Sequence, residues 1–183
     1  MKQAIRQSIL EKRKNLYPEE VTILSTQIQN NLLKIEAINT SKTIFTYISC
    51  KNEVDTIALI KSWLPEKIIY VPYIIDANHS QMVPSKISSL KDIVTHTYGI
   101  PATQNLNADS INDIQITIVP GIAFDKQGHR VGFGKGFYDR ILHNYHGIKI
   151  GLAYSFQIVD QLKSGSHDIP MDFIVTEKEI IHV

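Results

Sequence analysis

Two short runs of β-branched and aromatic residues constrain the fold of this chain more than any other feature. They are TIFTYI at 43–48 and KIIYVP at 67–72, and both are typical of buried strands, the second one ended by its proline. Between them, Val54–Leu64 is predicted to be a helix that stops at Pro65. A strand, a helix and a strand within about 30 residues predict a βαβ unit, whose two strands run parallel.

The alternation continues along the chain. Further strands are expected at 116–124, where the chain leaves through Pro120-Gly121, at 148–154 and at 173–176, and helices at 2–15, from Pro18 to Ile35 and near 136–145. The segment 76–113 is polar, and short strands are expected near 80–84 and 93–96. Strands alternating with helices predict an α/β fold. We expect a single domain over residues 1–183, with a mostly parallel sheet between helices on both faces, in a Rossmann-like three-layer arrangement.

The first helix is predicted to be basic and amphipathic. Ile5, Ile9 and Leu16 can share one face of it, and its polar residues include three cations, Lys2, Arg6 and Arg13. The chain as a whole is nearly neutral, with 19 Lys and Arg against 18 Asp and Glu. This balance argues against broad binding of nucleic acid or membrane through net charge, although a local basic site is compatible with it.

Several classes of protein and site are disfavoured by residues that the sequence lacks. The single cysteine, Cys50, cannot form an intrachain disulfide, and no apolar run reaches the length of a signal peptide or of a membrane span. A cytoplasmic protein is therefore the expectation. No H-E-x-x-H motif or cysteine pair supports a zinc site, and no G-x-S-x-G motif supports a hydrolase nucleophile.

The stretch GHRVGFGKGFYDRIL, residues 128–142, has four glycines within nine residues, two cations among them, and then a predicted helix. It matches neither the dinucleotide fingerprint nor a Walker A loop. Glycines still allow positive φ angles, and successive backbone amides in such turns can bind an anion, with help from the start of a helix. A glycine-rich hairpin turn is the plainer alternative. The two cations and the flanking strand and helix favour phosphate binding.

Carboxylates near this stretch have two interpretations each. Asp139 either favours the helix dipole or binds Mg²⁺ together with phosphate oxygens. Asp168 and Asp172 alone are typical of turns. Glu53 follows the first strand, where ligands of open α/β sheets bind, yet it also suits the first turn of a helix. Cys50 has no local signature of a nucleophile.

Residues 119–142, VPGIAFDKQGHRVGFGKGFYDRIL, resemble the signature of the 5-formyltetrahydrofolate cyclo-ligase family, also called 5,10-methenyltetrahydrofolate synthetases. Three further stretches resemble the family's motifs in the same order: KQAIR at 2–6, NEVDT at 52–56 and HDIPMDFIVTE at 167–177. The chain departs from the pattern at 99–102, where GIPA lacks the family's glutamate. The role of that loop is therefore open.

The resemblance implies an enzyme that uses ATP and Mg²⁺ to close 5-formyltetrahydrofolate to 5,10-methenyltetrahydrofolate, with release of ADP and phosphate. It implies catalytic roles for Arg130, Lys135 and Tyr138, and Mg²⁺ ligands at Asp139 and Asp172. Nucleotide contacts are implied for Lys2, Arg6, Arg130, Val131, Gly132, Phe133, Gly134, Lys135, Gly136, Phe137 and Tyr138. Folate contacts are implied for Ile48, Glu53, Phe133, Gly134, Lys135, Gly136 and Phe137.

Two alternatives of different classes stay open at this point. One is a nucleotide- or folate-binding protein without turnover, which would be expected to lose a metal carboxylate or Lys135, and this chain has both. The other is a sugar-phosphate isomerase-like α/β enzyme, which would work without ATP and gives no reason for the basic first helix. A monomer that binds a small-molecule substrate, and neither nucleic acid nor membrane, is the expectation.

Overall fold

The computed structural model describes residues 2–95, 101–163, 165 and 168–183. In chain order the elements are α1 Lys2–Lys14, α2 Pro18–Leu32, α3 Glu36–Thr40, β1 Thr43–Thr46, α4 Ile57–Trp63, β2 Ile68–Asp76, β3 Gln81–Ile87, η1 Leu90–Asp92, β4 Ile93–Thr95, β5 Pro101–Thr103, η3 Ile111–Asp113, β6 Ile116–Val119, β7 Ala123–Asp125, β8 Arg130–Val131, α5 Phe137–Ile141, β9 Ile148–Leu152, η4 Ser155–Gln157, β10 Ile158–Val159, β11 Phe173–Val175 and β12 Ile180–His182. Residues 96, 99, 100 and 167, which belong to segments discussed above, lie outside the described residues.

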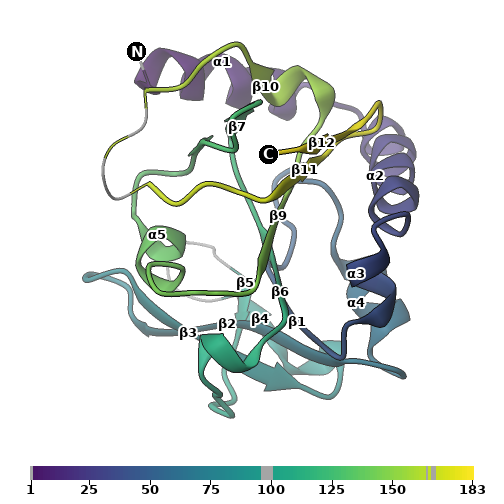
Figure 1. The fold of residues 1–183 in the computed structure, drawn as a ribbon, viewed down its shortest axis with the longest axis vertical. Helices are drawn as coiled ribbons and strands as arrows, with labels where there is room; N and C mark the ends of the chain where they lie inside the picture. The colour runs from purple at the N-terminus through teal and green to yellow at the C-terminus, as the bar shows by residue number, and fades with distance from the viewer. Residues whose placement is uncertain (1, 96–100, 164, 166–167) are drawn as a thin grey trace.

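A seven-stranded sheet in the order β12-β11-β9-β6-β1-β2-β3 forms the centre of the molecule (Figure 1). The five inner strands run parallel, and β3 and β12 pair antiparallel at the two edges. The mostly parallel α/β sheet is therefore confirmed. Two smaller sheets accompany it, β10-β7-β8 and β4-β5.

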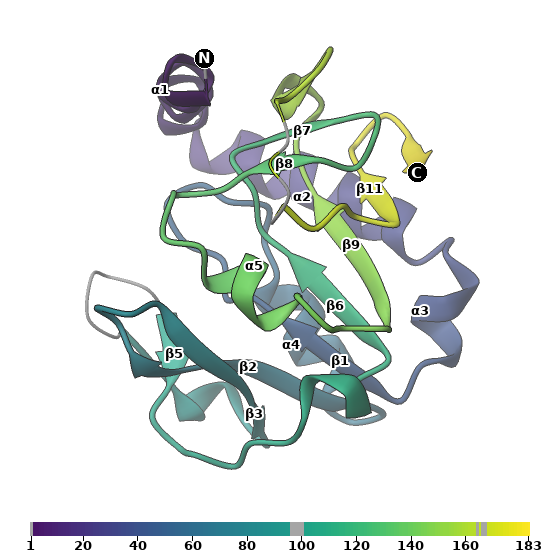
Figure 2. The same ribbon diagram turned by 60° about the vertical axis from the view of Figure 1, so that its left-hand side comes forward.

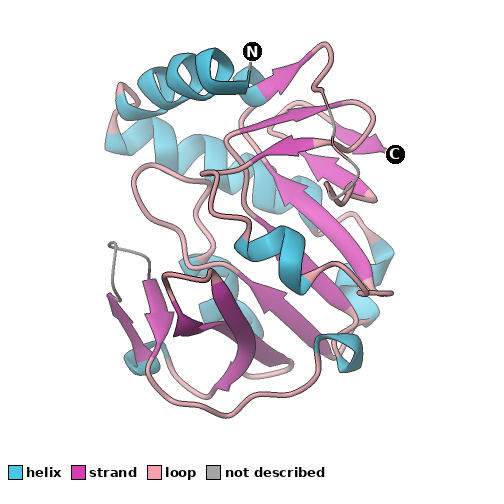
Figure 3. Ribbon diagram, turned by 90° about the vertical axis from the view of Figure 1, so that its left-hand side faces the viewer, coloured by secondary structure: helices cyan, strands magenta, loops and turns pink. Residues whose placement is uncertain are grey.

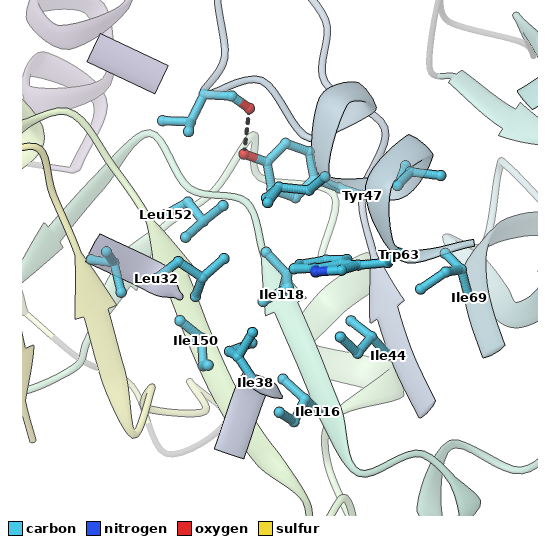
Figure 4. Close-up of a cluster of buried hydrophobic side chains, with 14 of the residues drawn as sticks. Leu32, Ile38, Ile44, Tyr47, Trp63, Ile69, Ile116, Ile118, Ile150 and Leu152 are labelled. Atoms are coloured by element: carbon cyan, nitrogen blue, oxygen red, sulfur yellow. Dashed lines mark hydrogen bonds between the residues drawn. The ribbon is translucent and has the colours of Figure 1, made fainter. Parts of the chain in front are cut away.

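The two faces of the sheet are covered unequally, as Figures 1 and 2 show. Helices α2, α3 and α4 pack on one face through an apolar cluster that includes Ile44, Trp63 and Ile118 (Figure 4). In the same cluster the Tyr47 hydroxyl donates to the Val54 carbonyl at 2.8 Å. The short helix α5 lies on the opposite face. Helices do lie on both faces, as predicted, but the second layer is thin and leaves room beside α5.

Alternation along the inner strands supplies side chains to both layers. In β1, Ile44 joins the cluster under α2–α4, whereas Phe45 packs with the α5 residues Tyr138 and Ile141. All three side-chain positions from Ile44 to Thr46 are buried. Because β1 is covered on both faces, its sequence is a continuous apolar and β-branched run rather than an alternating one.

Proline does not end the second strand, so that expectation is wrong. β2 continues through Pro72 to Asp76, and Pro72 faces Pro84 of β3. Neither proline has an N–H group, which suits a pair of residues that are not hydrogen-bonded to each other in an antiparallel ladder. On its other side β2 pairs with β1 only as far as Tyr70, so no ladder bond is missing there.

Other boundaries also differ from the sequence expectation. The segment 116–124 forms β6 and, after the break at Pro120-Gly121, β7 of a separate sheet. The helix expected near 136–145 is the five-residue α5. Strands β5 and β12 and helix α3 were not expected. Among the described residues, no helix is both long enough and apolar enough to cross a bilayer.

Candidate active site

A cavity of about 510 Å³ lies at the carboxyl ends of β1 and β6. The chain passes from β1 to β2 on one side, and β6 pairs with β1 on the other, so the direction of strand order reverses between β1 and β6. Ligands of open α/β sheets bind at such switch points. In Figure 3, the loop before the helix α5 and the β2–β3 ribbon face each other at this position. The cavity is therefore a substrate-sized site at the location that the fold favours.

The glycine-rich loop between β8 and α5 forms one wall of the cavity. Gly134 and Gly136 have φ angles of +87° and +73°, which favour glycine over any residue with a side chain. Within the described residues, no backbone hydrogen bond is donated by the amides of Gly132, Phe133, Gly134 or Gly136. The loop therefore offers backbone donors that a bound anion can use.

Helix α5 contributes less to anion binding than its expected length of ten residues would. With five residues, it aligns few peptide dipoles, and Gly136, the residue that precedes it, is left-handed. An anion at this wall would be held mainly by loop amides and by cations. Lys135 lines the cavity, and the Arg140 guanidinium donates to the Lys135 carbonyl at 2.9 Å, which fixes the end of the loop.

Arg130 lines the cavity from a mostly buried position. Its side chain is 6% exposed, and its Nη2 donates to Asp139 Oδ1 at 2.6 Å. Its guanidinium also lies 5.8 Å from the centre of the Tyr138 ring. Burial lowers the pKa of Arg130, and the Asp139 carboxylate opposes that shift. The Arg130–Asp139 ion pair therefore influences the shape and the charge of the cavity wall that the glycine loop forms.

Helix α1 brings two cations to the same cavity. Arg6 Nε donates to the carbonyl of Gly132 at 3.0 Å, so the helix is joined directly to the glycine loop. Lys2 Nζ lies 2.8 Å from Asp168 Oδ2. Both residues were expected to contact a nucleotide, and the structure brings both to the cavity together with the loop.

Another wall of the cavity carries Ile48 and Glu53, which follow β1. The Glu53 side chain is 9% exposed. Its Oε2 accepts from the Cys50 amide at 3.1 Å, and its Oε1 lies 3.6 Å from Arg13 Nη2. Burial raises the pKa of Glu53, and the positive charge of Arg13 opposes the shift.

Tyr138 lies beneath the cavity between these walls. Its ring stacks on Phe45, with the ring centres 6.0 Å apart, and burial raises its pKa well above the usual range. Its hydroxyl is buried and has no hydrogen-bond partner among the described residues. A neutral hydroxyl in this position is available to a ligand as donor or acceptor.

The carboxylates do not meet as the sequence predicted. Asp139 lines the cavity, but Asp172 does not, and its carboxylate instead binds the Lys149 ammonium at 2.8 Å and the Lys149 amide at 2.7 Å. Asp168, which the sequence placed in the same motif without a role, lines the cavity in its stead. The structure therefore does not bring Asp172 to the cavity together with Asp139. Among the described residues, no group of three His, Cys, Asp or Glu side chains could hold a metal ion.

Two further residues, Arg13 and Cys50, have surroundings in the structure that the sequence does not predict. Arg13 is predicted only as one of the polar residues of the first helix, yet its side chain is 2% exposed and faces Glu53. Its signal was the spacing of Lys2, Arg6, Ile9 and Arg13, which puts all four on one stripe of a helix. Cys50 lines the cavity, and burial and the nearby Glu53 raise its pKa to about 11. A thiol with that pKa is a poor nucleophile at neutral pH.

Comparison with known proteins covers nearly the whole chain. Residues 1–177 match the model of the 5-formyltetrahydrofolate cyclo-ligase family. The 5-formyltetrahydrofolate cyclo-ligase of Haemophilus influenzae is 31% identical over 176 residues, which are 93% of this chain and 94% of that protein.

Two solved structures share the fold and the length. The NMR structure of 5,10-methenyltetrahydrofolate synthetase from Aquifex aeolicus has a TM-score of 0.88 at 35% identity, over 99% of this chain and 92% of that one. The synthetase from Mycoplasma pneumoniae has a TM-score of 0.77 at 29% identity, over 96% and 98% of the two chains. With a matching family model, relatives of equal length and the family's motifs gathered around one cavity, this chain belongs to the 5-formyltetrahydrofolate cyclo-ligase family of enzymes.

Proposed function

We propose that this protein closes 5-formyltetrahydrofolate to 5,10-methenyltetrahydrofolate with consumption of ATP and release of ADP and phosphate. One observation carries the proposal. A single cavity of about 510 Å³ is lined by the glycine loop, by the cations Lys2 and Arg6, and by Ile48 and Glu53. Phosphate-binding and ring-binding features thus share one space, as a reaction between a nucleotide and a folate requires.

The reaction needs a phosphoryl group to move to the formyl oxygen. The bond from the γ-phosphorus to ADP breaks, and a bond from phosphorus to the formyl oxygen forms. N10 of the folate then attacks the formyl carbon, phosphate leaves with that oxygen, and N10 loses its proton. Phosphoryl transfer asks a protein mainly for positioning and for charge neutralisation, which amides of the glycine loop and the cations Lys2, Arg6 and Lys135 can supply.

The other end of the cavity suits a flat ring with N–H donors. The Glu53 carboxylate accepts hydrogen bonds, and a pterin edge presents such donors. Ile48 and Phe137 offer apolar and aromatic surface, and the Tyr138 hydroxyl has no other described partner. In this arrangement Glu53 orients the folate, and Tyr138 holds a polar atom of the ligand near the reacting groups.

Mg²⁺ fits this site only as an ion shared with phosphates. Asp139 and Asp168 are the aspartates that line the cavity, and each already binds a cation of the chain, Arg130 and Lys2 respectively. One or two carboxylates with phosphate oxygens suffice for Mg²⁺, which keeps several water ligands. When bound, the ion would neutralise negative charge on the phosphates. We assign Asp139 to this role because Arg130 can then turn its charge toward the nucleotide.

A direct assay tests the proposal. Formation of methenyl-folate is followed by its absorbance with and without ATP–Mg²⁺, in the parent and in the separate variants Asp139→Ala and Gly134→Val. We expect turnover only with ATP, and a large loss in both variants. Binding of folate without turnover would indicate a carrier protein, and turnover of a sugar phosphate without ATP would indicate an isomerase. Parent-level rates in both variants would show that turnover does not depend on the glycine loop.

We also propose a cytoplasmic monomer. The single cysteine and the lack of a helix able to cross a bilayer in the described part of the chain support the location. Light scattering across a range of protein concentrations measures the molar mass in solution, and a mass of about 21 kDa is expected.

A further inference from the structure

Arg13 is the largest of the fully buried side chains and lies in the last turn of α1. A buried guanidinium is costly unless charged or polar partners surround it. Its Nη2 donates to the Lys51 carbonyl at 3.1 Å and lies 3.6 Å from Glu53 Oε1, and its guanidinium is 5.8 Å from the centre of the Phe133 ring. The three partners line the active-site cavity, whereas Arg13 itself does not.

The turn that carries Glu53 donates hydrogen bonds to the end of α1 and also accepts one from it. Lys51 and Asn52 have positive φ angles of 49° and 58°, which are unusual for residues with side chains. The Asn52 amide group donates to the carbonyls of Arg13 and Leu16 at 3.0 and 3.1 Å, at the end of the helix. Arg13 returns a hydrogen bond to this turn through Lys51. This mutual contact supports a strained backbone next to Glu53.

The same helix reaches the other wall of the cavity. Lys2, Arg6, Ile9 and Arg13 follow one another at intervals of four, three and four residues, so they lie on one stripe. Arg6 binds the glycine loop, and Ile9 packs against Ala123 and Val131 of the small sheet. The stripe therefore joins the proposed nucleotide wall to the Glu53 wall.

We propose that Arg13 is a positioning residue for folate recognition, which aims the Glu53 carboxylate into the cavity and keeps it ionised. This inference rests on the proposed function, since it names the group that prepares Glu53 for the pterin. Arg13 touches neither substrate in this arrangement and acts through Glu53 and the 50–53 turn.

The charges around Glu53 make the inference testable by pH. The groups that face it are Arg13 of α1, Cys50 and Lys51 of its own turn, Tyr47 after β1, Tyr138 of α5 and Tyr154 after β9. The pKa values of the three tyrosines are raised, and that of Cys50 is about 11, so these four groups stay neutral between pH 5 and 9. The positive charge of Arg13 favours the ionised form of the Glu53 carboxyl group.

The experiment measures binding of 5-formyltetrahydrofolate without ATP by calorimetry between pH 5 and 9, in the parent and in Arg13→Met. Methionine keeps the apolar stem and removes the charge. Loss of an opposite charge at this distance raises a carboxyl pKa by about one unit or more. Binding requires ionised Glu53, so the pH below which affinity falls should move upward by about one unit or more, while the affinity for ADP stays within about twofold.

Further variants separate positioning from general damage. Lys12→Met and Lys14→Met each remove an exposed cation from the same helix turn and should leave the pH profile unchanged. Arg13→Lys keeps the charge and should restore the position of the acid limb. If Arg13→Met does not fold, Arg13→Gln keeps a donor for the Lys51 carbonyl and carries the same predicted shift.

The possible results distinguish a failure of the role proposed for Arg13 from a failure of the proposed function. A parent protein that does not bind 5-formyltetrahydrofolate overturns the proposed function. A parent that binds it, together with an Arg13→Met or Arg13→Gln variant whose acid limb is unmoved or whose affinity falls equally at every pH, overturns only the role of Arg13. The same upward shift in Lys12→Met or Lys14→Met would also overturn it, because the effect would then be one of net charge.

Discussion

Replacing Gly134 by alanine isolates the contribution of the loop backbone. Gly134 has a φ angle of +87°, and a Cβ atom there would come no closer than 3.6 Å to its nearest described neighbour, Arg6 Nη2. This is an ordinary contact distance, so no clash adds to the effect. The remaining cost is that of holding an L-residue in a left-handed conformation, about 1–2 kcal/mol.

That free energy must appear in one of two measurements. If the loop keeps its conformation, the free energy of unfolding falls by about 1–2 kcal/mol, which lowers the melting temperature of a chain of this size by about 2–8 °C. If the loop relaxes to a negative φ, stability is retained but the amides turn away, and nucleotide binding must restore them. The dissociation constant for ADP then rises by about 5- to 30-fold.

Thermal unfolding and ADP calorimetry on the same preparation measure both quantities. Gly128→Ala is the matched control, because Gly128 also has a positive φ, +82°, but lies in the β7–β8 turn. Its Cβ would come within 2.7 Å of the Met171 carbonyl oxygen, so a larger loss of stability with normal ADP affinity is expected. Parent-like stability combined with parent-like ADP affinity in Gly134→Ala would refute the claim that this backbone shape serves the nucleotide.

Three other substitutions have definite expected outcomes. Asp139→Asn removes the proposed Mg²⁺ ligand and should raise the Mg²⁺ concentration needed for half-maximal turnover by at least about tenfold. It should also lower the free energy of unfolding by about 1 kcal/mol, because Arg130 loses its charged partner. Asp172→Asn should leave that Mg²⁺ requirement within about twofold in the same titration, since its carboxylate binds Lys149, and an equal effect of the two would restore Asp172 as a ligand. Asp125→Asn replaces a buried carboxylate that accepts hydrogen bonds from three backbone amides. The free energy of unfolding, measured in urea, should fall by about 2–4 kcal/mol, while the KM for ATP stays unchanged. A fall of less than about 1 kcal/mol would contradict this expectation.

The sequence predicts the inner strands well because burial on both faces leaves a strong local signal. Ile44 and Phe45 in β1 are apolar together, which short strands of a parallel sheet require. The β2–β3 ribbon was harder to predict, since Pro72 usually ends a strand and is tolerated here only because it faces another proline beyond the end of β1. That arrangement depends on the partner strand and cannot be read locally.

The candidate active site likewise has one part that the sequence predicts and another part that depends on tertiary packing. Glycines and cations of the loop are contiguous in the sequence, and their positions on one wall follow from the strand before them and the helix after them. Only tertiary packing brings Asp168 to the cavity and Arg13 to the turn beside it. Arg13 is buried by the turn after β1, and Asp168 pairs with Lys2 from the opposite end of the chain. Asp172 lies four residues from Asp168, yet packing directs it to another partner.

A crystal structure of the protein with ADP, Mg²⁺ and 5-formyltetrahydrofolate would show whether the glycine loop binds the nucleotide. We expect phosphate oxygens within hydrogen-bond distance of amides between Gly132 and Gly136, and the pterin ring against Glu53 in the same cavity. Phosphates bound elsewhere, with the glycine loop unchanged and closed off by its own side chains, would contradict it.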